Sequence, residues 1–338
     1  MTLWLLIPTV AVLSLLLTAI LRRYALAHSL MDIPNARSSH TVSTPRGGGV
    51  AIVLSFLPGV LVLAGLDALS WPTAFALLGS GGWVAVIGFL DDHGHVAARW
   101  RLLAHVVAAI WALAWLGGLP PVAVFGGVVE AGWAGYGVAV LFLVWLLNLY
   151  NFMDGIDGIA GVETLTVCAS GALLYVLIGQ LDLALLPLLL AVAAGGFLYW
   201  NFPPAKIFMG DAGSGFLGMA IGVLALQAGW VAPQLLWCWM ILLAVFIVDA
   251  TWTLLRRLLR GDKVYEAHRS HAYQHASRRH EGHLPVTMTV LAINVCWLLP
   301  VALAVGVGYL DGFLGFGLAC TPLVLLAMKY NAGKQEQQ

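Results

Sequence analysis

Apolar runs of membrane-spanning length follow one another along the whole chain and leave room only for short connections. A helix that crosses a bilayer needs about 20 mainly apolar residues, and eleven runs of roughly this length occur here. They are apolar on every side and do not alternate with polar residues, so they predict helices and not the strands of a barrel. We expect an all-α polytopic membrane protein with about eleven transmembrane helices. The runs cover approximately residues 3–20, 50–68, 73–90, 102–119, 136–150, 160–179, 183–199, 214–230, 233–255, 286–308 and 312–328.

Charge is scarce and balanced over the 338 residues. Hydrophobic residues make up 61% and charged residues 9%, with sixteen basic and sixteen acidic side chains and a net charge of zero. A soluble domain carries about 25% charged residues, so this composition excludes both a soluble globular fold and intrinsic disorder. A net charge of zero also gives no reason to expect a nucleic-acid partner.

The basic residues occupy alternate loops and the C-terminal tail. The opposite loops contain no Lys or Arg and hold only four acidic residues: Asp67, Glu130, Asp182 and Asp311. The positive-inside rule then predicts that the N-terminus lies outside and the C-terminus in the cytoplasm, which requires an odd number of spans. The first run lacks a basic n-region and a clear cleavage site, so we interpret it as a retained span.

Several features of the spans and outer loops predict no chemistry. The four cysteines all lie within apolar runs and lack metal-ligand spacing, which predicts free thiols. The outer segment 117–137 is rich in Gly, Pro and Val and predicts a short hairpin. No internal repeat is evident, which weighs against carriers built from inverted halves.

Two motifs at the inner ends of the first spans combine Gly, Arg and Asp. Residues 44–49 read Thr-Pro-Arg-Gly-Gly-Gly, in which the glycines would allow the backbone to approach a phosphate and Arg46 would add bidentate contacts. A flexible turn is the alternative. The third run ends in Asp91 and Asp92, two adjacent carboxylates that the dipole at a helix C-terminus disfavours. They need solvation, pairing or a metal, so a functional role and a solvated loop both stay open.

The densest polar run follows the fifth span and extends from Asn148 to Gly158. Asn148 and Asn151 are three residues apart, as are Asp154 and Asp157, so each pair shares a face if helical geometry continues. The run lacks the spacing and terminal Glu of a calcium-binding loop, and we reject that interpretation.

Two later inner loops carry further candidates. After the seventh span, two prolines break the helix, Lys206 could contact phosphate, and Asp211 stands among glycines that permit close approach of a ligand. A turn and helix cap is the alternative there. Asp249, about two turns inside the ninth run, is an intramembrane acid that either belongs to the site or pairs with a neighbouring helix.

The longest inner loop, at about 256–285, is rich in His and Arg. Spacings of three and four could place His268, His271 and His275 on one helical stripe. Three histidines could ligate zinc, but the hard carboxylates of the neighbouring loops favour phosphate or sugar contacts. The basic cluster at 256–263 could also anchor the loop on anionic lipid.

Taken together, these loops predict phosphoryl-transfer chemistry at one face of the membrane. Hard oxygen ligands suit Mg²⁺ or Mn²⁺ held together with a substrate diphosphate. Phosphoryl transfer chiefly needs a metal, cationic clamps and in-line positioning. A soluble phosphorylated substrate would arrive from the cytoplasm and an apolar acceptor from the lipid. The five carboxylates expected at one depth are Asp91, Asp92, Asp154, Asp157 and Asp211.

The motifs, in this order, resemble those of the polyprenyl-phosphate N-acetylhexosamine-1-phosphate transferases (glycosyltransferase family 4). That superfamily includes the MraY-type enzymes of peptidoglycan synthesis and the WecA-type initiators of O-antigen synthesis. The resemblance runs from about residue 45 to residue 275. The matching strings are Pro45–Gly48, Gly88–Asp92, Asn148–Gly158, Phe208–Ser214, and Asp249 with the basic His loop after it.

The resemblance implies transfer of a sugar 1-phosphate from a UDP-N-acetylhexosamine to undecaprenyl phosphate, with release of UMP. It implies a bacterial inner-membrane enzyme that starts O-antigen or another surface polysaccharide. The chain would form one catalytic domain, 1–338, possessing an active site that faces the cytoplasm, and a homodimer is a candidate assembly. The site-forming loops would be about 21–49, 91–101, 148–159, 200–214 and 256–285.

The same resemblance implies roles for individual residues. Asp211, Asn151 and Asp154 would hold Mg²⁺, for which Mn²⁺ could substitute. Asp91 or Asp92 would position or deprotonate the lipid phosphate, and Asp154 and Asp157 are further catalytic candidates. The implied substrate-binding residues are Arg46, Gly47, Gly48, Asn148, Asn201, Lys206, Phe208, His268, Arg269 and His271.

Two departures from the family pattern occur, and the second, in the loop expected to read the sugar, concerns the donor. Many relatives carry a Lys shortly after the paired Asp, but here His93, Gly94 and His95 follow. The family's His-x-His-His reads His271-Ala-Tyr-Gln274 in this chain. The donor sugar is therefore expected to be GlcNAc or a 6-deoxy N-acetyl sugar such as FucNAc or QuiNAc.

Two other functions compete with this interpretation. An ion-coupled transporter with an acidic cytoplasmic site is the alternative, although its acids should lie near the membrane midplane on broken helices. A CDP-alcohol phosphotransferase would need an Arg in its Asp-Gly-x-x-Ala-Arg motif, and the run Asp157–Gly161 has none.

Overall fold

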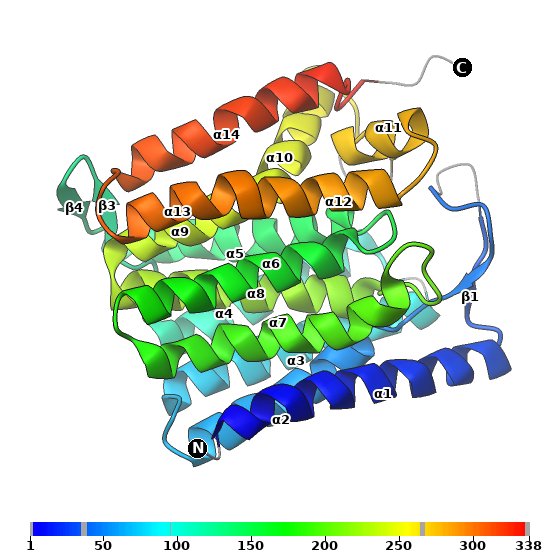
Figure 1. Cartoon of the computed structure of the whole chain (residues 1–338), viewed down its shortest axis with the longest axis horizontal. Helices are drawn as coiled ribbons and strands as arrows, with labels where there is room; N and C mark the ends of the chain where they lie inside the picture. The colour runs from blue at the N-terminus through cyan, green and yellow to red at the C-terminus, as the bar shows by residue number, and fades with distance from the viewer. Residues whose placement is uncertain (1–2, 35–38, 95, 264–267, 335–338) are drawn as a thin grey trace.

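The computed structural model of this protein describes residues 3–34, 39–94, 96–263 and 268–334. Long helices lie side by side in a bundle, and their connections gather at its two ends (Figure 1). The helix α1 starts at one end of the bundle, and α14 finishes at the other. An all-α fold is therefore confirmed.

Within the described residues, five α-helices precede residue 154 and nine more follow, several of them short. A 3₁₀ turn, η1 (Leu3–Leu5), leads into α1, and a π-helical turn, η2, separates α12 from α13. The first five helices are α1 (Leu6–Ala27), α2 (Val50–Gly65), α3 (Trp71–His93), α4 (Ala98–Leu116) and α5 (Ala134–Met153). The next five are α6 (Ile159–Leu177), α7 (Leu181–Asn201), α8 (Asp211–Val231), α9 (Pro233–Leu242) and α10 (Ala244–Leu259). The last are α11 (Ala272–Arg279), α12 (Leu284–Ile293), η2 (Asn294–Leu298), α13 (Leu299–Gly306) and α14 (Gly312–Lys329).

Each of the eleven predicted apolar runs falls on a helix or on a helix pair. Among the described residues, nine helices are long and apolar enough to cross a membrane, with α12 to α13 counted as one. The pair α9 and α10 makes a tenth candidate that is bent by 70°, and α2 is a shorter apolar helix of 16 residues. The polytopic class is confirmed, while the count of eleven spans and the orientation in the membrane remain predictions.

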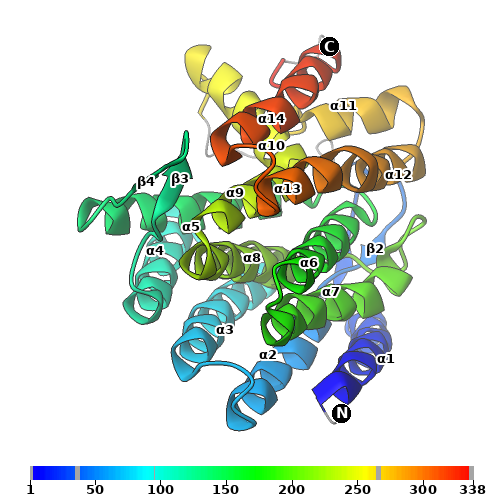
Figure 2. The same cartoon turned by 60° about the vertical axis from the view of Figure 1, so that its left-hand side comes forward.

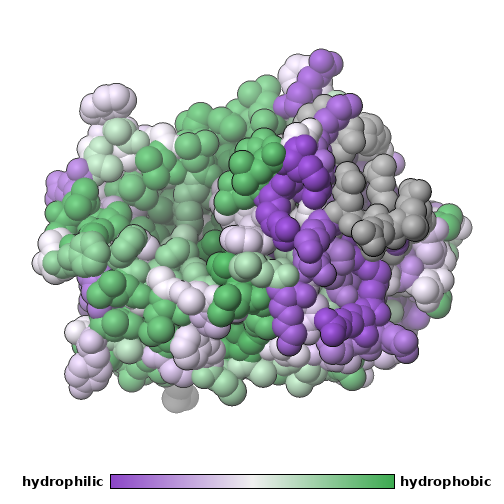
Figure 3. All heavy atoms as spheres, turned by 90° about the horizontal axis from the view of Figure 1, so that it is seen from above, coloured by the Kyte–Doolittle hydropathy of each residue, from purple (hydrophilic) through white to green (hydrophobic). Residues whose placement is uncertain are grey.

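The two ends of the bundle differ in polarity. Strands β3 (Val122–Val124) and β4 (Gly127–Val129) pair antiparallel and confirm the predicted hairpin. They lie at the end opposite to the antiparallel pair β1 (Met31–Asp32) and β2 (Thr44–Pro45) (Figure 2). Hydrophilic residues gather at the end that carries α11 and the last turn of α14, and apolar residues cover much of the remaining face (Figure 3).

Glycines let the backbones of α2, α3 and α8 touch at the polar end. A Cβ atom at Gly88 of α3 would lie 2.5 Å from the nitrogen of Ala212, and one at Gly49 would lie 2.5 Å from the Cα of Gly213. Small residues at such crossings permit the close approach on which helix association in membranes depends. The first turn of α8 is thereby fixed against two other helices by main-chain contact.

A polar network inside the apolar core links α6 to η2. The Nδ2 of Asn294 donates to Oε2 of Glu163 at 2.7 Å and to Oγ1 of Thr166 at 2.8 Å. Asn294 is the first residue of the π turn, where the extra residue per turn rotates side chains relative to an α-helix. The four cysteines are free, as predicted.

Candidate active site

A polar cavity of 250 Å³ lies where α3 and α5 end and α8 begins. Further lining residues come from the first loop, from the α5–α6 and α7–α8 connections and from α11. These segments are far apart in the sequence and meet at the polar end of the bundle. Eight of the predicted site residues line the cavity: Arg46, Asp92, Asn151, Asp154, Asp157, Asn201, Phe208 and Asp211.

The paired carboxylates at the end of α3 have different partners. Asp92 is buried, and its two carboxylate oxygens accept the backbone N–H groups of Asp211 and Ala212 at 3.1 and 3.2 Å. Asp91 lines a smaller neighbouring cavity and pairs with Arg101, whose guanidinium also lies 3.4 Å from Oδ2 of Asp211. One carboxylate thus caps α8, and the other is joined to Asp211 through a cation.

Asn151 and Asp211 form the most direct contact between α5 and α8 in the site. The Nδ2 of Asn151 donates to Oδ1 of Asp211 at 2.8 Å and to Oγ of Ser214 at 2.9 Å. Asp211 is the first residue of α8, where the helix dipole favours a negative charge. With Nδ2 committed to these two acceptors, the amide oxygen of Asn151 is left as the group that could serve a ligand.

The helix α5 ends at Met153, so the two Asp residues that follow are not on a helical face. The condition on which Asp154 and Asp157 would share such a face, that helical geometry continues, is therefore not met. The chain turns there, and Gly158 adopts φ +76°, a conformation that glycine permits. Asp157 instead acts as a junction: its Oδ2 accepts the N–H of Ala205 at 2.9 Å, and its carbonyl oxygen accepts the hydroxyl of Thr287 at 2.8 Å.

Asp154 lies among other acids. Desolvation raises the pKa of Asp154 well above its usual range, and the neighbouring carboxylates, Asp211 foremost, add to the effect. A carboxyl group in this setting keeps its proton to a higher pH than usual, and a bound positive charge favours its release. Asp154 is therefore a side chain whose ionisation a bound cation would favour.

The Pro-Arg-Gly-Gly motif packs against the segment directly before α8. The N–H groups of Gly48 and Gly49 donate to the carbonyls of Phe208 and Met209, both at 2.9 Å. Arg46 donates to the backbone carbonyl of Asp92 and lines the cavity. Gly47 adopts φ +93°, which explains a glycine at this turn.

Three of the predicted substrate-binding residues differ in whether they line the 250 Å³ cavity. Asn201 is buried and bridges the backbone, with Oδ1 accepting from Gly158 at 2.9 Å and Nδ2 donating to Ile207 at 2.9 Å. Asn148 lines the smaller cavity beside Asp91. The ammonium of Lys206 lies 5.5 Å from the ring centre of Trp200, outside the 250 Å³ cavity.

The histidine loop is arranged differently from the predicted stripe. The helix α11 begins only at Ala272, and His271 before it has extended backbone, so His268, His271 and His275 do not share one helical face. Asp249 holds the start of this helix, accepting the N–H groups of Ala272 and Tyr273 at 2.8 and 2.9 Å.

The remaining residues of this loop lie beside α10. His268 and Arg269 line a separate cavity of 240 Å³. Burial lowers the pKa of His268 to about 3, helped by the nearby His271 and Arg257. The buried His271 stacks on His268 with ring centres 4.9 Å apart.

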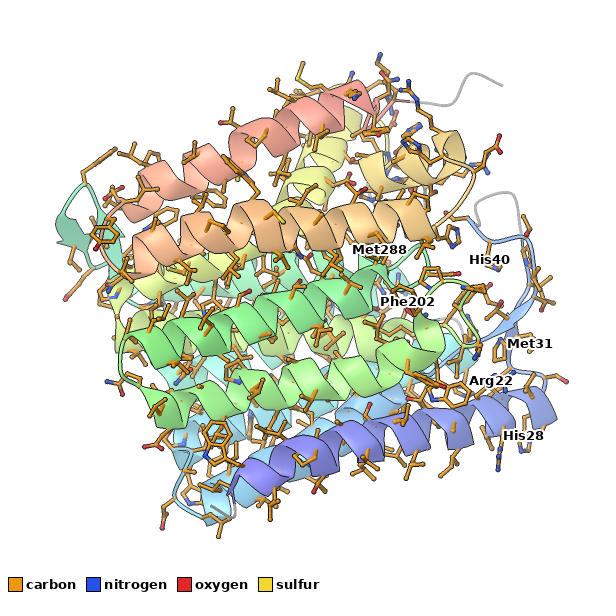
Figure 4. The ribbon with its side chains drawn as sticks, viewed as in Figure 1. Arg22, His28, Met31, His40, Phe202 and Met288 are labelled. Carbon is orange, nitrogen blue, oxygen red and sulfur yellow. The ribbon has the colours of Figure 1, made fainter. Side chains whose placement is uncertain are left out.

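Five lining residues with polar side chains were not predicted as site residues: Asp32, Ser39, His40, Gln274 and His283. The ring of His40 packs edge-on against Phe208 with centroids 4.8 Å apart, and Figure 4 places His40 on the first loop at the polar end. For the three in the first loop, Asp32, Ser39 and His40, the polar sequence before the Pro-Arg-Gly motif could have predicted a place in the site. Gln274 was noted only as a departure from the family pattern.

The donor set at the cavity fits a hard divalent cation held partly by substrate. Asp154, Asp211 and the amide oxygen of Asn151 supply oxygen ligands, which suit Mg²⁺. Among the described residues no group of three or more His, Cys, Asp or Glu side chains is arranged to hold a metal ion. Mg²⁺ commonly binds through one or two carboxylates plus substrate phosphates, and this arrangement matches that mode.

Comparison with known proteins yields one family and a set of relatives. A family model described as "Glycosyl transferase family 4" matches residues 74–229. A Bacillus subtilis protein named "Probable undecaprenyl-phosphate N-acetylglucosaminyl 1-phosphate transferase" is 32% identical over 266 residues, which cover 77% of this chain and 73% of that protein.

Two further relatives have related names. A "Decaprenyl-phosphate N-acetylglucosaminephosphotransferase" of Mycolicibacterium smegmatis is 29% identical, over 80% of this chain and 76% of the relative. A "Phospho-N-acetylmuramoyl-pentapeptide-transferase" of Moorella thermoacetica is 35% identical, over 54% of this chain and 61% of the relative.

Proposed function

Because the chain belongs to glycosyl transferase family 4, we propose that it transfers a sugar 1-phosphate from a UDP-sugar to undecaprenyl phosphate in the membrane. The family and its polyprenyl-phosphate relatives support the class of reaction. The UDP-sugar donor, Mg²⁺ dependence and an active site facing the cytoplasm form the finer part of the proposal. The proposed location is the bacterial inner membrane.

The observation that carries the proposal is one polar cavity at the end of a membrane bundle. Asp154 and Asp211 line it together with Arg46 and Phe208. Acids that could hold a cation, a guanidinium for phosphate and an aromatic ring for a base are what a nucleoside diphosphate sugar needs.

The proposed reaction exchanges one phosphoanhydride bond for another. An oxygen of the acceptor phosphate forms a bond to the β-phosphorus of the donor. The bond from that phosphorus to the oxygen bridging to the α-phosphate breaks, and UMP leaves with the electron pair. A phosphate monoester with a second pKa near 6 is already mostly ionised at neutral pH, so a general base contributes modestly.

The chain's own residues would bind and orient the reactants. Asp211, Asp154 and Asn151 would hold Mg²⁺, which when bound neutralises charge on the diphosphate. Arg46 would contact a phosphate, and Phe208 would pack on the nucleobase. Asp92 would act through α8, because its carboxylate is committed to the N–H groups of Asp211 and Ala212.

The donor sugar is proposed as GlcNAc or a 6-deoxy N-acetyl sugar such as FucNAc or QuiNAc, for the start of O-antigen or another surface polysaccharide. Gln274 supports a 6-deoxy N-acetyl sugar, because it lines the cavity at a position where the family pattern has His. Its Oε1 accepts the N–H of His271 at 3.2 Å, so its amide nitrogen is left as the group that could contact a ligand.

The test supplies purified protein with undecaprenyl phosphate and Mg²⁺, and separately with UDP-GlcNAc, UDP-GalNAc or UDP-FucNAc. We expect one donor to give a lipid-linked sugar of the calculated mass and an equal amount of UMP. Asp211→Asn should abolish both products. Asp182→Asn, an exposed acid in the first turn of α7, is the matched control and should retain them. No lipid-linked product from any UDP-sugar would contradict the proposed reaction.

A further inference from the structure

The imidazole of His283 joins segments of the chain that are far apart in sequence. Its Nε2 lies 3.0 Å from the carbonyl oxygen of Ser39 in the first loop. Its Nδ1 lies 3.1 Å from Oδ1 of Asp157 in the α5–α6 connection. His283 itself directly precedes α12, so one ring connects three segments.

Asp157 extends this junction to a fourth segment. Its second carboxylate oxygen accepts the N–H of Ala205 in the α7–α8 connection, and its carbonyl accepts the hydroxyl of Thr287 in α12. The side chains of His283 and Asp157 are only 14% and 12% exposed, so the ion pair is largely shielded from water. Shielded pairs of this kind are screened by salt less than surface pairs are.

The junction stands between two cavities. Ser39, Asp157 and His283 line both the 250 Å³ cavity of the candidate site and an outer cavity of 700 Å³. His40 and Phe208 also line both. A change in the position of the first loop would therefore alter the wall of the candidate site.

The contacts of the ring match its protonated form. Both ring nitrogens face oxygen acceptors, and only a protonated imidazole donates from both. The Nδ1 also lies 3.3 Å from the backbone nitrogen of Asp157. In a neutral ring, an unprotonated Nδ1 would accept a hydrogen bond from that N–H. Burial lowers the pKa of His283, but the hydrogen bond and charge of Asp157 outweigh it, so that the pKa is raised above its ordinary value. The contact of Nδ1 with the carboxylate, at 3.1 Å, is the shorter of the two.

We propose that His283 is a positioning residue that ties the first loop to Asp157 and so holds the wall of the candidate site in place. The inference rests on the proposed function for its effect on the reaction, while the tether itself is a property of the fold. Substrate binding would depend on His283 more than the chemical step does, because the ring contacts loop and wall residues and not Asp154 or Asp211.

Three variants separate the two contacts of the ring. His283→Gln places an amide donor near the position of Nε2 and can keep the bond to Ser39. His283→Asn places a donor near the position of Nδ1 and can keep the bond to Asp157. His283→Ala removes both. His280→Ala is the matched control. His280 lies in the same α11–α12 connection, but its Nε2 contacts the hydroxyl of Tyr330 at 3.0 Å.

Hydrogen exchange of residues 39–45 tests the tether without any need for turnover. We expect exchange there to be about tenfold faster in His283→Ala and His283→Asn, as fits the loss of a hydrogen bond to a charged donor. It should stay close to the wild-type rate in His283→Gln and His280→Ala. Equal exchange in wild type and His283→Ala, or no recovery in His283→Gln, overturns the proposal.

Donor kinetics test the consequence for the reaction. In His283→Ala we expect KM for the donor to rise about tenfold and kcat to change less than about threefold. The variant should lose binding energy that the ground state and the transition state share, which raises KM and leaves kcat nearly unchanged. A fall in kcat as large as the rise in KM overturns the positioning role. If no donor gives product in the wild type, the proposed function fails, and the exchange measurement still decides the tether.

Discussion

The carboxylate of Asp92, at the end of α3, accepts the backbone N–H of Asp211, the first residue of α8, at 3.1 Å. A second bond, to the N–H of Ala212, makes this side chain the cap of the helix that presents Asp211 to the cavity. The relationship gives Asp92 a structural reason to be an acid, separate from any contact with substrate.

Asp92→Asn should therefore destabilise the protein. The amide offers one acceptor oxygen in place of two, so one N–H at the start of α8 loses its partner, at a cost of about 1 kcal/mol. Thermal or urea unfolding in detergent measures the change, and Glu130→Gln, an exposed acid in an outer loop, serves as control. Unchanged stability together with lost turnover would instead support the prediction that Asp92 acts on the lipid phosphate.

Gly88→Ala should disturb the same contact from the backbone side. The added methyl group would lie 2.5 Å from the nitrogen of Ala212, and main-chain atoms of a packed helix cannot easily move away. Overpacking of this kind costs typically 1–3 kcal/mol, and turnover should fall because Asp211 is displaced. Gly82→Ala in the same helix is the matched control, since its methyl would meet Leu57 at an ordinary 3.9 Å. Equal effects of the two substitutions would contradict the argument.

Mg²⁺ should stabilise the folded protein, and more strongly as the pH rises. Because the pKa of Asp154 is raised, a cation binding there must displace a proton, and affinity grows as that proton becomes easier to lose. Without metal the sign is opposite: a carboxyl whose folded pKa is raised makes the protein less stable as the pH rises from its ordinary pKa through the folded one. Mg²⁺ at about 100 times its Kd would add about 2.7 kcal/mol.

Thermal unfolding with Mg²⁺ and with EDTA at several pH values checks this expectation. Asp154→Asn should weaken the pH dependence of the Mg²⁺ effect, because the amide has no proton to release, whereas the second carboxylate, Asp211, remains in the site. A stabilisation by Mg²⁺ that is independent of pH in the wild type would argue against Asp154 as the titrating ligand.

The orientation in the membrane can be tested with single cysteines at the two ends of the bundle. Glu281 and Glu130 are exposed and lie at opposite ends, so Glu281→Cys should react with an impermeant thiol reagent only from the cytoplasmic side and Glu130→Cys only from outside. Cys296 and Cys320, which are not fully buried, would first be replaced by Ala. The reverse labelling pattern would invert the predicted topology.

Hydropathy predicted the helices well because each apolar run must satisfy its backbone hydrogen bonds internally in lipid. It could not reveal where a span breaks. The 70° bend between α9 and α10 and the π turn at Asn294 lie inside continuous apolar runs. Both depend on tertiary packing, which periodicity does not encode.

The candidate site was predictable where its chemistry is local. The five Asp residues end, follow or begin helices at one end of the bundle, so their grouping follows from the alternation of loops. His283 and Ser39 could not be paired in advance, because 244 residues separate them and nothing in either neighbourhood refers to the other. Lys206 shows the opposite case: a cation beside Asp211 in sequence turns instead toward Trp200.

The backbone contact between Gly49 and Gly213 has a consequence for how relatives of this protein can diverge. The distance between the start of α2 and the start of α8 is set by main-chain atoms, so it does not change when side chains around the cavity are exchanged. Loops that line the cavity can vary in sequence while this spacing stays constant. Substrate range and phosphoryl chemistry can thus evolve as two independent traits of one scaffold.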